Sequence, residues 1–271
     1  MRVILKEALR WNNGTAQARI RSTMKIWIVL PAYNEAEALP LLLDALIESF
    51  SEEKKNYSII VVNDGSADDT GRIIDEYGLK GQVIPIHNDG NKGLAETIRR
   101  GLMEGCKRAG DKDILITMDA DNTHPAGLAL RMSRLIQEGN DVVIASRYRE
   151  GSHVRGLSFF RRTLSFGAGW LFRVMFPIRG VRDYTCGYRA YRASTIKRLV
   201  EKYGREFVSE RGFSCMVDIL LRLREEDLVF AEVPLVLRYD LKPGLSKMKV
   251  LETVMDTLKL LIRRRFAFLS K

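Results

Sequence analysis

The sequence predicts an α/β fold in which a mostly parallel central sheet is flanked by helices, with an amphipathic helix at the C-terminal end. From Lys25 to Ser146, short apolar runs alternate with longer segments of helical period, as is typical of a parallel sheet covered by helices. Glycine and proline residues stand where the apolar runs end, so the chain leaves each strand through a turn. With 271 residues, of which 46% are hydrophobic, the chain can bury a substantial core.

The first half of the chain contains five predicted strands, each a short run rich in apolar and β-branched residues. They cover residues 26–30, 57–62, 82–87, 114–118 and 141–145. The helices predicted between them cover residues 35–49, 67–77, 91–109 and 125–138. Turn residues at the strand exits are Pro31, Gly65, Gly90 and Pro125. Because parallel strands end at one edge of a sheet, we expect ligand-binding loops at these exits.

The regular alternation stops after Arg147. The chain continues as an arginine-rich aromatic stretch, a Gly-Tyr-Arg turn at residues 187–189, two further helices and a strand at residues 228–237. The segment 246–268 has helical period, and its apolar side chains fall on one stripe while most of its lysines and arginines lie elsewhere. It therefore predicts a basic amphipathic helix.

Charge is distributed unevenly along the chain, whose formal net charge is +10. Residues 1–24 carry +4, residues 25–154 carry −6 and residues 155–271 carry +12. An acidic half suits metal coordination, whereas a basic half suits phosphates, anionic lipid headgroups or nucleic acid. The three cysteines are widely spaced and form no CxxC pair, so neither a disulfide framework nor a thiolate zinc site is expected.

Two carboxylates, Asp119 and Asp121, directly follow the apolar strand that ends at Met118. Carboxylate oxygens are preferred ligands of hard divalent cations, and two carboxylates one residue apart at a turn can converge on one ion. Such an ion can bridge the phosphates of a nucleotide sugar. The alternative is that Asp121 only caps the helix that follows.

Polar residues also follow the first two predicted strands. Tyr33 and Glu35 could place a ring and a carboxylate near a nucleotide, or Glu35 could only stand near the positive end of a helix dipole. Asp64 could accept hydrogen bonds from a base edge, while Ser66 or Asp68 caps the next helix. Each motif alone leaves both readings open.

The order of these motifs is more specific than any one of them. Pro-Ala-Tyr-Asn-Glu at 31–35, Val-Asn-Asp-Gly-Ser at 62–66, Asn-Lys-Gly at 91–93, Met-Asp-Ala-Asp at 118–121 and Ala-Ser-Arg-Tyr at 145–148 occur in that order. This order resembles the family 2 inverting glycosyltransferases, which have the GT-A nucleotide-diphospho-sugar transferase fold. Within that family the chain is most similar to the dolichyl- or polyprenyl-phosphate mannose synthases, and the resemblance covers about residues 25–265.

The resemblance implies a nucleotide-sugar donor, with GDP-mannose favoured, and a divalent metal cofactor. Residues expected to line the donor are Pro31, Tyr33, Glu35, Val62, Asp64, Asn91 and the backbone around Ala120. Asp119 and Asp121 would bind Mg²⁺ or Mn²⁺ together with the donor diphosphate. Many relatives carry Gln two residues after the second Asp, whereas this chain has Thr123 followed by His124, which leaves either as the candidate for a third ligand.

The resemblance also implies a polyprenyl (dolichyl) phosphate acceptor. Arg147, Arg161 and Arg238 join the two aspartates as expected catalytic residues, and the phosphate-binding residues are Arg161, Ser165, Arg238 and Lys247. Guanidinium groups bind phosphate oxygens bidentately, although any one of these arginines could be an ordinary solvated charge. Relatives often have a second Arg two residues beyond the one that corresponds to Arg238, and this chain has Asp240 at that position.

Three further residues near the acceptor side have alternative readings. Tyr184 and Tyr188, in a segment that resembles the family, could equally be core aromatics. Asp218 stands where some relatives with hydroxyl acceptors have a carboxylate base. A lipid phosphate is already an anion and needs no such base.

These implications divide the chain. Residues 1–24 are an extension, residues 25–245 a GT-A catalytic domain and residues 246–271 the basic C-terminal helix. Within the domain, residues 25–147 form the nucleotide-sugar half and residues 148–245 the acceptor half, with an interfacial segment at 155–178. Aromatic and aliphatic residues beside arginines suit a membrane surface; they are Phe159, Phe160, Phe166, Trp170, Leu171 and Phe172. Both amphipathic segments could instead pack on the domain.

The location expected from these features is peripheral, on the cytoplasmic face of a membrane. No apolar run approaches the ~20 residues that a membrane-spanning helix needs. A peripheral location is compatible with a membrane-embedded partner subunit. Competing readings are another donor, such as UDP-glucose or UDP-GlcNAc, a hydroxyl acceptor, and a basic module that binds nucleic acid or membranes. The acidic half and the lack of a nucleic-acid-binding module argue against nucleic acid, and no GxGxxG motif indicates a dinucleotide.

Overall fold

The structure is a computed structural model that describes residues 24–156, 167, 169, 171–210, 212 and 214–241. Several predictions lie outside these residues: nearly all of the extension at 1–24, most of the interfacial segment and the C-terminal helix. The predicted site residues outside them are Arg161, Ser165 and Lys247. No helix in the described part of the chain is long and apolar enough to cross a membrane.

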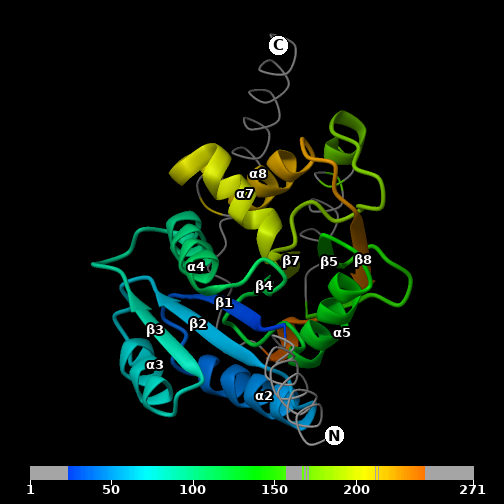
Figure 1. Cartoon of the computed structure of the whole chain (residues 1–271). Helices are drawn as coiled ribbons and strands as arrows, with labels where there is room; N and C mark the ends of the chain where they lie inside the picture. Colours follow the sequence, from blue (N-terminus) through cyan, green and yellow to red (C-terminus); the bar gives the residue numbers. More distant parts are fainter. Residues whose placement is uncertain are drawn as a thin grey trace, which may run out of the picture.

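A seven-stranded sheet forms the centre of the molecule, in the order β3-β2-β1-β4-β7-β5-β8 (Figure 1). Its strands are β1 (Ile26–Ala32), β2 (Tyr57–Asn63), β3 (Val83–His87), β4 (Ile114–Thr117), β5 (Val142–Ser146), β7 (Arg189–Arg192) and β8 (Phe230–Pro234). Only β7 runs antiparallel to its neighbours; the other pairs of this sheet are parallel. The predicted mostly parallel sheet is therefore confirmed.

Helices cover both faces of the sheet, with α4 and α7 on one face and α2 and α5 on the other (Figure 1). The helices are α2 (Leu39–Glu52), α3 (Thr70–Leu79), α4 (Leu94–Arg108), α5 (Ala126–Gln137), α7 (Ala193–Tyr203) and α8 (Ser214–Leu223). Helix α4 packs closely on β1 at Gly101, which has no Cβ. A Cβ at this position would lie only 2.4 Å from Val29 Cγ1. The strands beneath are almost completely buried, as expected of a sheet covered on both sides.

Three helices begin three or four residues later than predicted. Helix α2 begins at Leu39 rather than at residue 35, α3 at Thr70 rather than at 67, and α4 at Leu94 rather than at 91. In each case the preceding backbone N–H groups donate to side chains of neighbouring loops, as described below. Tertiary hydrogen bonds therefore hold the strand exits open as loops and delay the helices.

Strand β7 was not predicted, and the expected Gly-Tyr-Arg turn at 187–189 is wrong. Gly187 leads instead into a strand that begins at Arg189 and lies between β4 and β5. Tyr188 and Tyr191 are fully buried, because this short segment occupies the middle of the sheet. A four-residue strand inserted antiparallel between distant strands has no local sequence signal comparable to a long apolar run.

The predicted strand at 228–237 is divided into two at Leu235. Strand β8 ends at Pro234, and the chain then forms β9 (Val236–Arg238), which pairs with β6 (His153–Arg155) in a separate two-stranded parallel sheet. Leu235 links the sheets: its N–H donates to the carbonyl of Ser146, and its carbonyl accepts from His153. A short 3₁₀ turn, η2 (Tyr239–Leu241), follows β9.

The aromatic residues between β6 and β7 that the structure describes belong to the core. Tyr184 and Phe172 are fully buried and stack with ring centroids 5.8 Å apart. The Tyr184 hydroxyl donates to the carbonyl of Phe176 at 2.8 Å. Tyr184 and Tyr188 are thus core aromatics, and the assignment of Phe172 to a membrane surface is wrong. All three cysteines are free, as expected.

Candidate active site

The loops after β1 and β2 are tied together by hydrogen bonds at the carboxyl edge of the sheet. The N–H of Asn34 donates to Ser66 Oγ at 2.9 Å, and the N–H of Ala67 donates to Asn34 Oδ1 at 2.8 Å. Asp68 Oδ2 accepts from the N–H of Ala36 at 3.1 Å. Asn34 has a φ of 52°, which a short polar side chain tolerates. The two exits therefore form one connected rim.

Asp64 holds the loop between β3 and α4 against this rim. Its Oδ1 accepts from Asn88 Nδ2 at 2.8 Å and from the N–H of Lys92 at 2.9 Å, and its Oδ2 accepts from the N–H of Gly93 at 2.9 Å. Asp64 is only 4% exposed. The sequence offered this carboxylate as a possible acceptor for a nucleotide base; in the structure it accepts from three donors of the protein, which gives it a supporting role.

The other predicted donor-binding residues surround the same rim. Pro31 and Val62 are register partners at the ends of β1 and β2, and Tyr33 follows with 38% exposure. Asn91 is exposed in the β3–α4 loop. Val62 is fully buried beneath α4 and is paired on both sides within the sheet, so the structure does not expose it to a ligand. Glu35 is half-buried, and its N–H donates to Thr70 Oγ1 at 2.8 Å.

The turn after β4 presents the two predicted metal-binding carboxylates. The Asp119 side chain is 38% exposed, whereas Asp121 is 8% exposed. Asp121 Oδ1 accepts from the hydroxyl of Thr123 at 2.6 Å and from its N–H at 3.2 Å. Asn122 between them has a φ of 58°. Thr123 therefore fixes the orientation of Asp121, a role that its hydroxyl performs by donating.

His124 supports the same turn through its ring. Its Nδ1 lies 3.3 Å from the N–H of Asp119 and accepts from it, so in the neutral ring Nε2 carries the proton. Nε2 is 3.9 Å from Asp119 Oδ2, and the ring stacks on Tyr188 with centroids 4.9 Å apart. His124 is only 5% exposed and its ring is held by these contacts, so it supports the carboxylate turn, and its role as a third ligand stays a prediction.

The donor set fits a hard divalent cation that takes its remaining ligands from substrate and water. No group of three histidine, cysteine or acidic side chains converges on one point within the described residues. Two carboxylates are nevertheless the usual protein share for Mg²⁺, which keeps several waters and binds substrate phosphates. Asp119 and Asp121 would hold such an ion, while Thr123 would orient Asp121.

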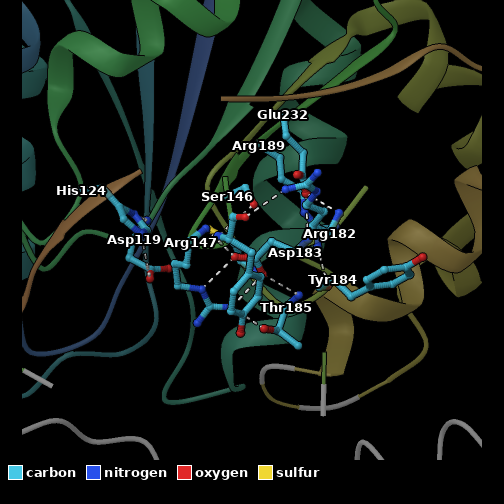
Figure 2. Close-up of polar contacts among 12 residues, drawn as sticks. Asp119, His124, Ser146, Arg147, Arg182, Asp183, Tyr184, Thr185, Arg189 and Glu232 are labelled. Carbon is cyan, nitrogen blue, oxygen red and sulfur yellow. Dashed lines mark hydrogen bonds and ion pairs between the residues drawn. The ribbon is translucent and has the colours of Figure 1, made fainter. Parts of the chain in front are cut away.

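Arg147 is held by a buried carboxylate across the site. Its Nε donates to Asp183 Oδ2 at 2.8 Å, and its Nη2 donates to Asp183 Oδ1 at 2.7 Å and to Thr185 Oγ1 at 2.5 Å (Figure 2). Burial by itself would raise the pKa of Asp183, but the charge and hydrogen bonds of Arg147 hold that pKa below its usual value. Arg147 is thus fixed in one orientation by a charged, bidentate contact.

Glu232 of β8 fixes the segment that carries Asp183. Its Oε1 accepts from the N–H groups of Arg182 and Asp183 at 2.6 and 2.7 Å (Figure 2). Its side chain is fully buried, and this burial raises the pKa of Glu232. Within the described part of the chain its Oε2 has no hydrogen-bond partner, and Arg149 Nε lies 3.9 Å from it. The carboxylate therefore supports the Arg147 contact from a site unfavourable to charge.

The segment 183–189 also reaches the carboxylate turn. A Cβ at Gly187 would lie 3.5 Å from Asp119 Oδ1, and the carbonyl of Gly187 accepts from Thr117 Oγ1 at 2.8 Å. The unpredicted strand β7 therefore brings the Arg147–Asp183 pair to the same edge of the sheet as Asp119. Only tertiary pairing creates this proximity.

Arg238 is anchored to the carboxylate turn by its backbone. Its N–H donates to the carbonyl of Thr123 at 3.0 Å, so β9 lies directly against the turn that carries Asp121. The Arg238 side chain forms an ion pair with Asp240, described further below. Arg147 and Arg238 are thus the predicted arginines that the structure describes, and they approach the site from different loops.

Asp218, the alternative base for a hydroxyl acceptor, is not available for that role. It is fully buried, and its Oδ2 accepts from the N–H and the hydroxyl of Ser209 at 2.9 and 2.8 Å. Its Oδ1 lies 3.6 Å from Arg222 Nε. A carboxylate that is buried and supplied with donors has no access to a substrate hydroxyl.

Sequence reasoning missed the supporting residues more than the exposed ones. Thr185 and Glu232 were not singled out, and Asp183 belongs to the resembling segment that was noted only for its two tyrosines. A charged residue within the otherwise apolar strand 228–237 was the one signal for Glu232. Nothing local indicates which distant group such a residue supports.

Comparison with known proteins gives a consistent result. The Glycosyl transferase family 2 model matches residues 27–200. Over 237 residues the chain is 31% identical to the polyprenol monophosphomannose synthase of Mycolicibacterium smegmatis, covering 87% of this chain and 85% of that protein. Over 212 residues it is 33% identical to the dolichol-phosphate mannosyltransferase of Pyrococcus furiosus, covering 78% of this chain and 56% of that protein.

A solved structure shows the same fold. Glucosyl-3-phosphoglycerate synthase from Mycobacterium tuberculosis, in complex with Mn²⁺, UDP and phosphoglyceric acid, matches with a TM-score of 0.58 at 20% identity. The match covers 90% of this chain and 79% of that chain. The likeness confirms the predicted GT-A fold, and at this identity it speaks to the fold alone.

Proposed function

Because this chain belongs to glycosyl transferase family 2 and is a glycosyltransferase, we propose that it transfers a hexose to a polyprenyl (dolichyl) phosphate. The proposed donor is GDP-mannose and the proposed sugar is mannose, since the two relatives are named for mannose transfer to such lipids. The observation that carries the proposal is the backbone contact between Arg238 and Thr123, which sets an arginine-bearing strand against the carboxylate turn.

Charge complementarity supports a phosphate acceptor. Donor diphosphate and acceptor phosphate are both anions, so a site that binds them side by side must offset their repulsion. Arg238 supplies a cation beside the carboxylate turn, Asp183 holds Arg147 at the same edge of the sheet, and a divalent ion held by Asp119 and Asp121 would neutralise the donor diphosphate and stabilise it as it departs. A phosphate acceptor places a second anion beside the donor diphosphate, so it needs more positive charge in the site than a neutral alcohol acceptor does.

The proposed reaction is a direct displacement with inversion. An oxygen of the lipid phosphate attacks the anomeric carbon and forms the new carbon–oxygen bond. The bond from that carbon to the donor diphosphate breaks, and the nucleoside diphosphate leaves with the electron pair. The nucleophile is already an anion near neutral pH, so no proton has to be removed. This agrees with the inaccessible position of Asp218.

The proposed place of action is the cytoplasmic membrane surface, reached as a peripheral protein. A polyprenyl tail stays in the bilayer, so the enzyme must meet the phosphate at the interface. The basic half of the chain, with +12 over residues 155–271, suits attraction to anionic headgroups. The same proposal includes a membrane-embedded partner subunit that assists the enzyme there.

The test is a donor and acceptor screen with the full chain. Radiolabelled GDP-mannose, UDP-glucose and UDP-GlcNAc are each incubated with Mg²⁺ and a polyprenyl phosphate, and chloroform-soluble label is counted. We expect label from GDP-mannose, and its loss with chelator or in Asp121→Asn. Asp111→Asn is the control, because Asp111 is an exposed partner of Lys197. Transfer only to a water-soluble acceptor would refute the lipid assignment, and label from another nucleotide sugar would refute the donor.

A further inference from the structure

An internal ion pair occupies the guanidinium of Arg238. Its Nε donates to the two carboxylate oxygens of Asp240 at 2.9 and 3.1 Å, and its Nη2 donates to Oδ2 at 2.8 Å. A guanidinium binds two oxygens of a phosphate in the same forked arrangement. The Asp240 carboxylate therefore stands where two oxygens of a phosphate would be bound.

A second arginine lies beside this pair. Arg155 of β6 is the register partner of Arg238 in the two-stranded sheet. The hydrogen bonds from Arg238, together with the charges of Arg238 and Arg155, hold the pKa of Asp240 below its ordinary value. Asp240 thus pairs with one arginine and feels the charge of a second, so the local charge remains positive.

The position of Asp240 is built into the fold. Gly156, with a φ of 79°, lies under the turn, and a Cβ there would be 2.9 Å from the backbone nitrogen of Asp240. Glycine at this point lets η2 approach the end of β6 closely. The N–H of Arg238 donates to Thr123, whose hydroxyl donates to Asp121. The arginine–aspartate pair is therefore one hydrogen-bonded step from the carboxylate turn.

We propose that Arg238 is an anion-binding residue which Asp240 occupies in the substrate-free enzyme and which a substrate phosphate takes over by displacing Asp240. The inference rests on the proposed function for the presence of a phosphate substrate. Asp240 then sets the affinity for that phosphate, because binding must first break the internal pair. It also returns to Arg238 when the phosphate leaves, which aids release.

Exposure and charge make this exchange feasible. The Arg238 and Asp240 side chains are 34% and 39% exposed, so water and ligands reach both. Exposed ion pairs of this kind are weak. A phosphate monoester near pH 8 carries about two negative charges against one for a carboxylate, and it attracts Arg238 and Arg155 more strongly than Asp240 does.

Isothermal titration of the full chain tests the exchange without turnover. The ligands are farnesyl phosphate, representing the acceptor, and GDP with Mg²⁺, representing the donor, at constant ionic strength and pH 8. The proteins are the wild type, Asp240→Asn, Arg238→Ala and the double variant. Asp111→Asn serves as the matched control, because it removes one exposed carboxylate from a pair with Lys197 far from β9 in the sequence.

We expect Asp240→Asn to bind one of the two ligands about three- to tenfold more tightly, with the gain absent in the Arg238→Ala background and in Asp111→Asn. A gain with farnesyl phosphate assigns the site to the acceptor, and a gain with GDP assigns it to the donor. Unchanged or weaker binding of both ligands, or an equal gain without Arg238, would overturn the proposal. Because no transfer is measured, failure of the proposed reaction would leave this result intact.

Discussion

Asp183 accepts two parallel hydrogen bonds from the guanidinium of Arg147, although 36 residues separate them in the chain. The carboxylate is fully buried, and it also accepts from the N–H groups of Arg147 and Cys186 at 3.0 and 3.1 Å. A single buried side chain therefore fixes both the backbone and the side chain of an arginine at the candidate site.

Asp183→Asn is expected to destabilise the protein strongly. Removing one partner of a buried ion pair leaves the other charge uncompensated, at about 3–5 kcal/mol. Urea unfolding measures this loss. Asp111→Asn is the comparison: it breaks the exposed pair with Lys197 and should change the free energy of unfolding by less than about 1 kcal/mol. Equal losses in the two variants would contradict the assignment.

Asp183 and Glu232 should change the pH dependence of the free energy of unfolding in opposite directions. The folded-state pKa of Asp183 is lowered, so its contribution is present above the ordinary value of 3.8 and is lost as the pH falls through the folded pKa. The pKa of Glu232 is raised by burial, so its contribution is complete below the ordinary 4.5 and is lost as the pH rises through the folded pKa.

Glu232→Gln isolates the second effect. The amide keeps an oxygen that can accept from Arg182 and Asp183 and removes a buried charge, so the variant should be at least as stable as the wild type at pH 7. Any advantage should shrink as the pH falls from the raised folded pKa of Glu232 towards 4.5. Thermal unfolding of both proteins between pH 4 and 8 tests this. A melting temperature of the variant that falls further below that of the wild type at pH 7 than at pH 4 would contradict the prediction.

Thr123→Val is expected to weaken the use of a divalent ion by roughly tenfold, because groups that orient metal-binding carboxylates matter nearly as much as the ligands. The lost contact is the 2.6 Å hydrogen bond to Asp121. The Mg²⁺ concentration for half-maximal activity is the measurement. Thr195→Val is matched to it, since the buried Thr195 hydroxyl has no hydrogen-bond partner. That control should leave the Mg²⁺ requirement unchanged.

Gly65→Ala is expected to destabilise the rim of the site by more than about 1 kcal/mol. Gly65 has a φ of 66°, and its Cβ would lie 2.3 Å from the carbonyl carbon of Gly90. Gly127→Ala is the control, because Gly127 lies within α5 and a Cβ there meets nothing within 4 Å. It should stabilise the helix by about 0.5–1 kcal/mol. Calorimetry of both variants measures whether the melting temperature falls in Gly65→Ala and rises in Gly127→Ala.

The sequence by itself was enough to predict the strands of the first half and to single out candidate site residues at their ends. The five strands of the first half and both helices after β7 were predicted, because apolar period and turn residues are local properties. The carboxylates Asp119 and Asp121 could be singled out in the same way, since they directly follow an apolar strand. Their role with a metal stays a prediction.

Tertiary structure alone decided how those residues are used. Asp64 and Asp183 are both acidic residues in loops of the sequence, yet one holds the β3–α4 loop and the other holds Arg147. The segment that begins at Arg189 forms a central strand because it pairs with β4 and β5, which lie far away along the chain. A hydrogen bond between distant residues depends on how the whole sheet assembles, and no local pattern of residues encodes it.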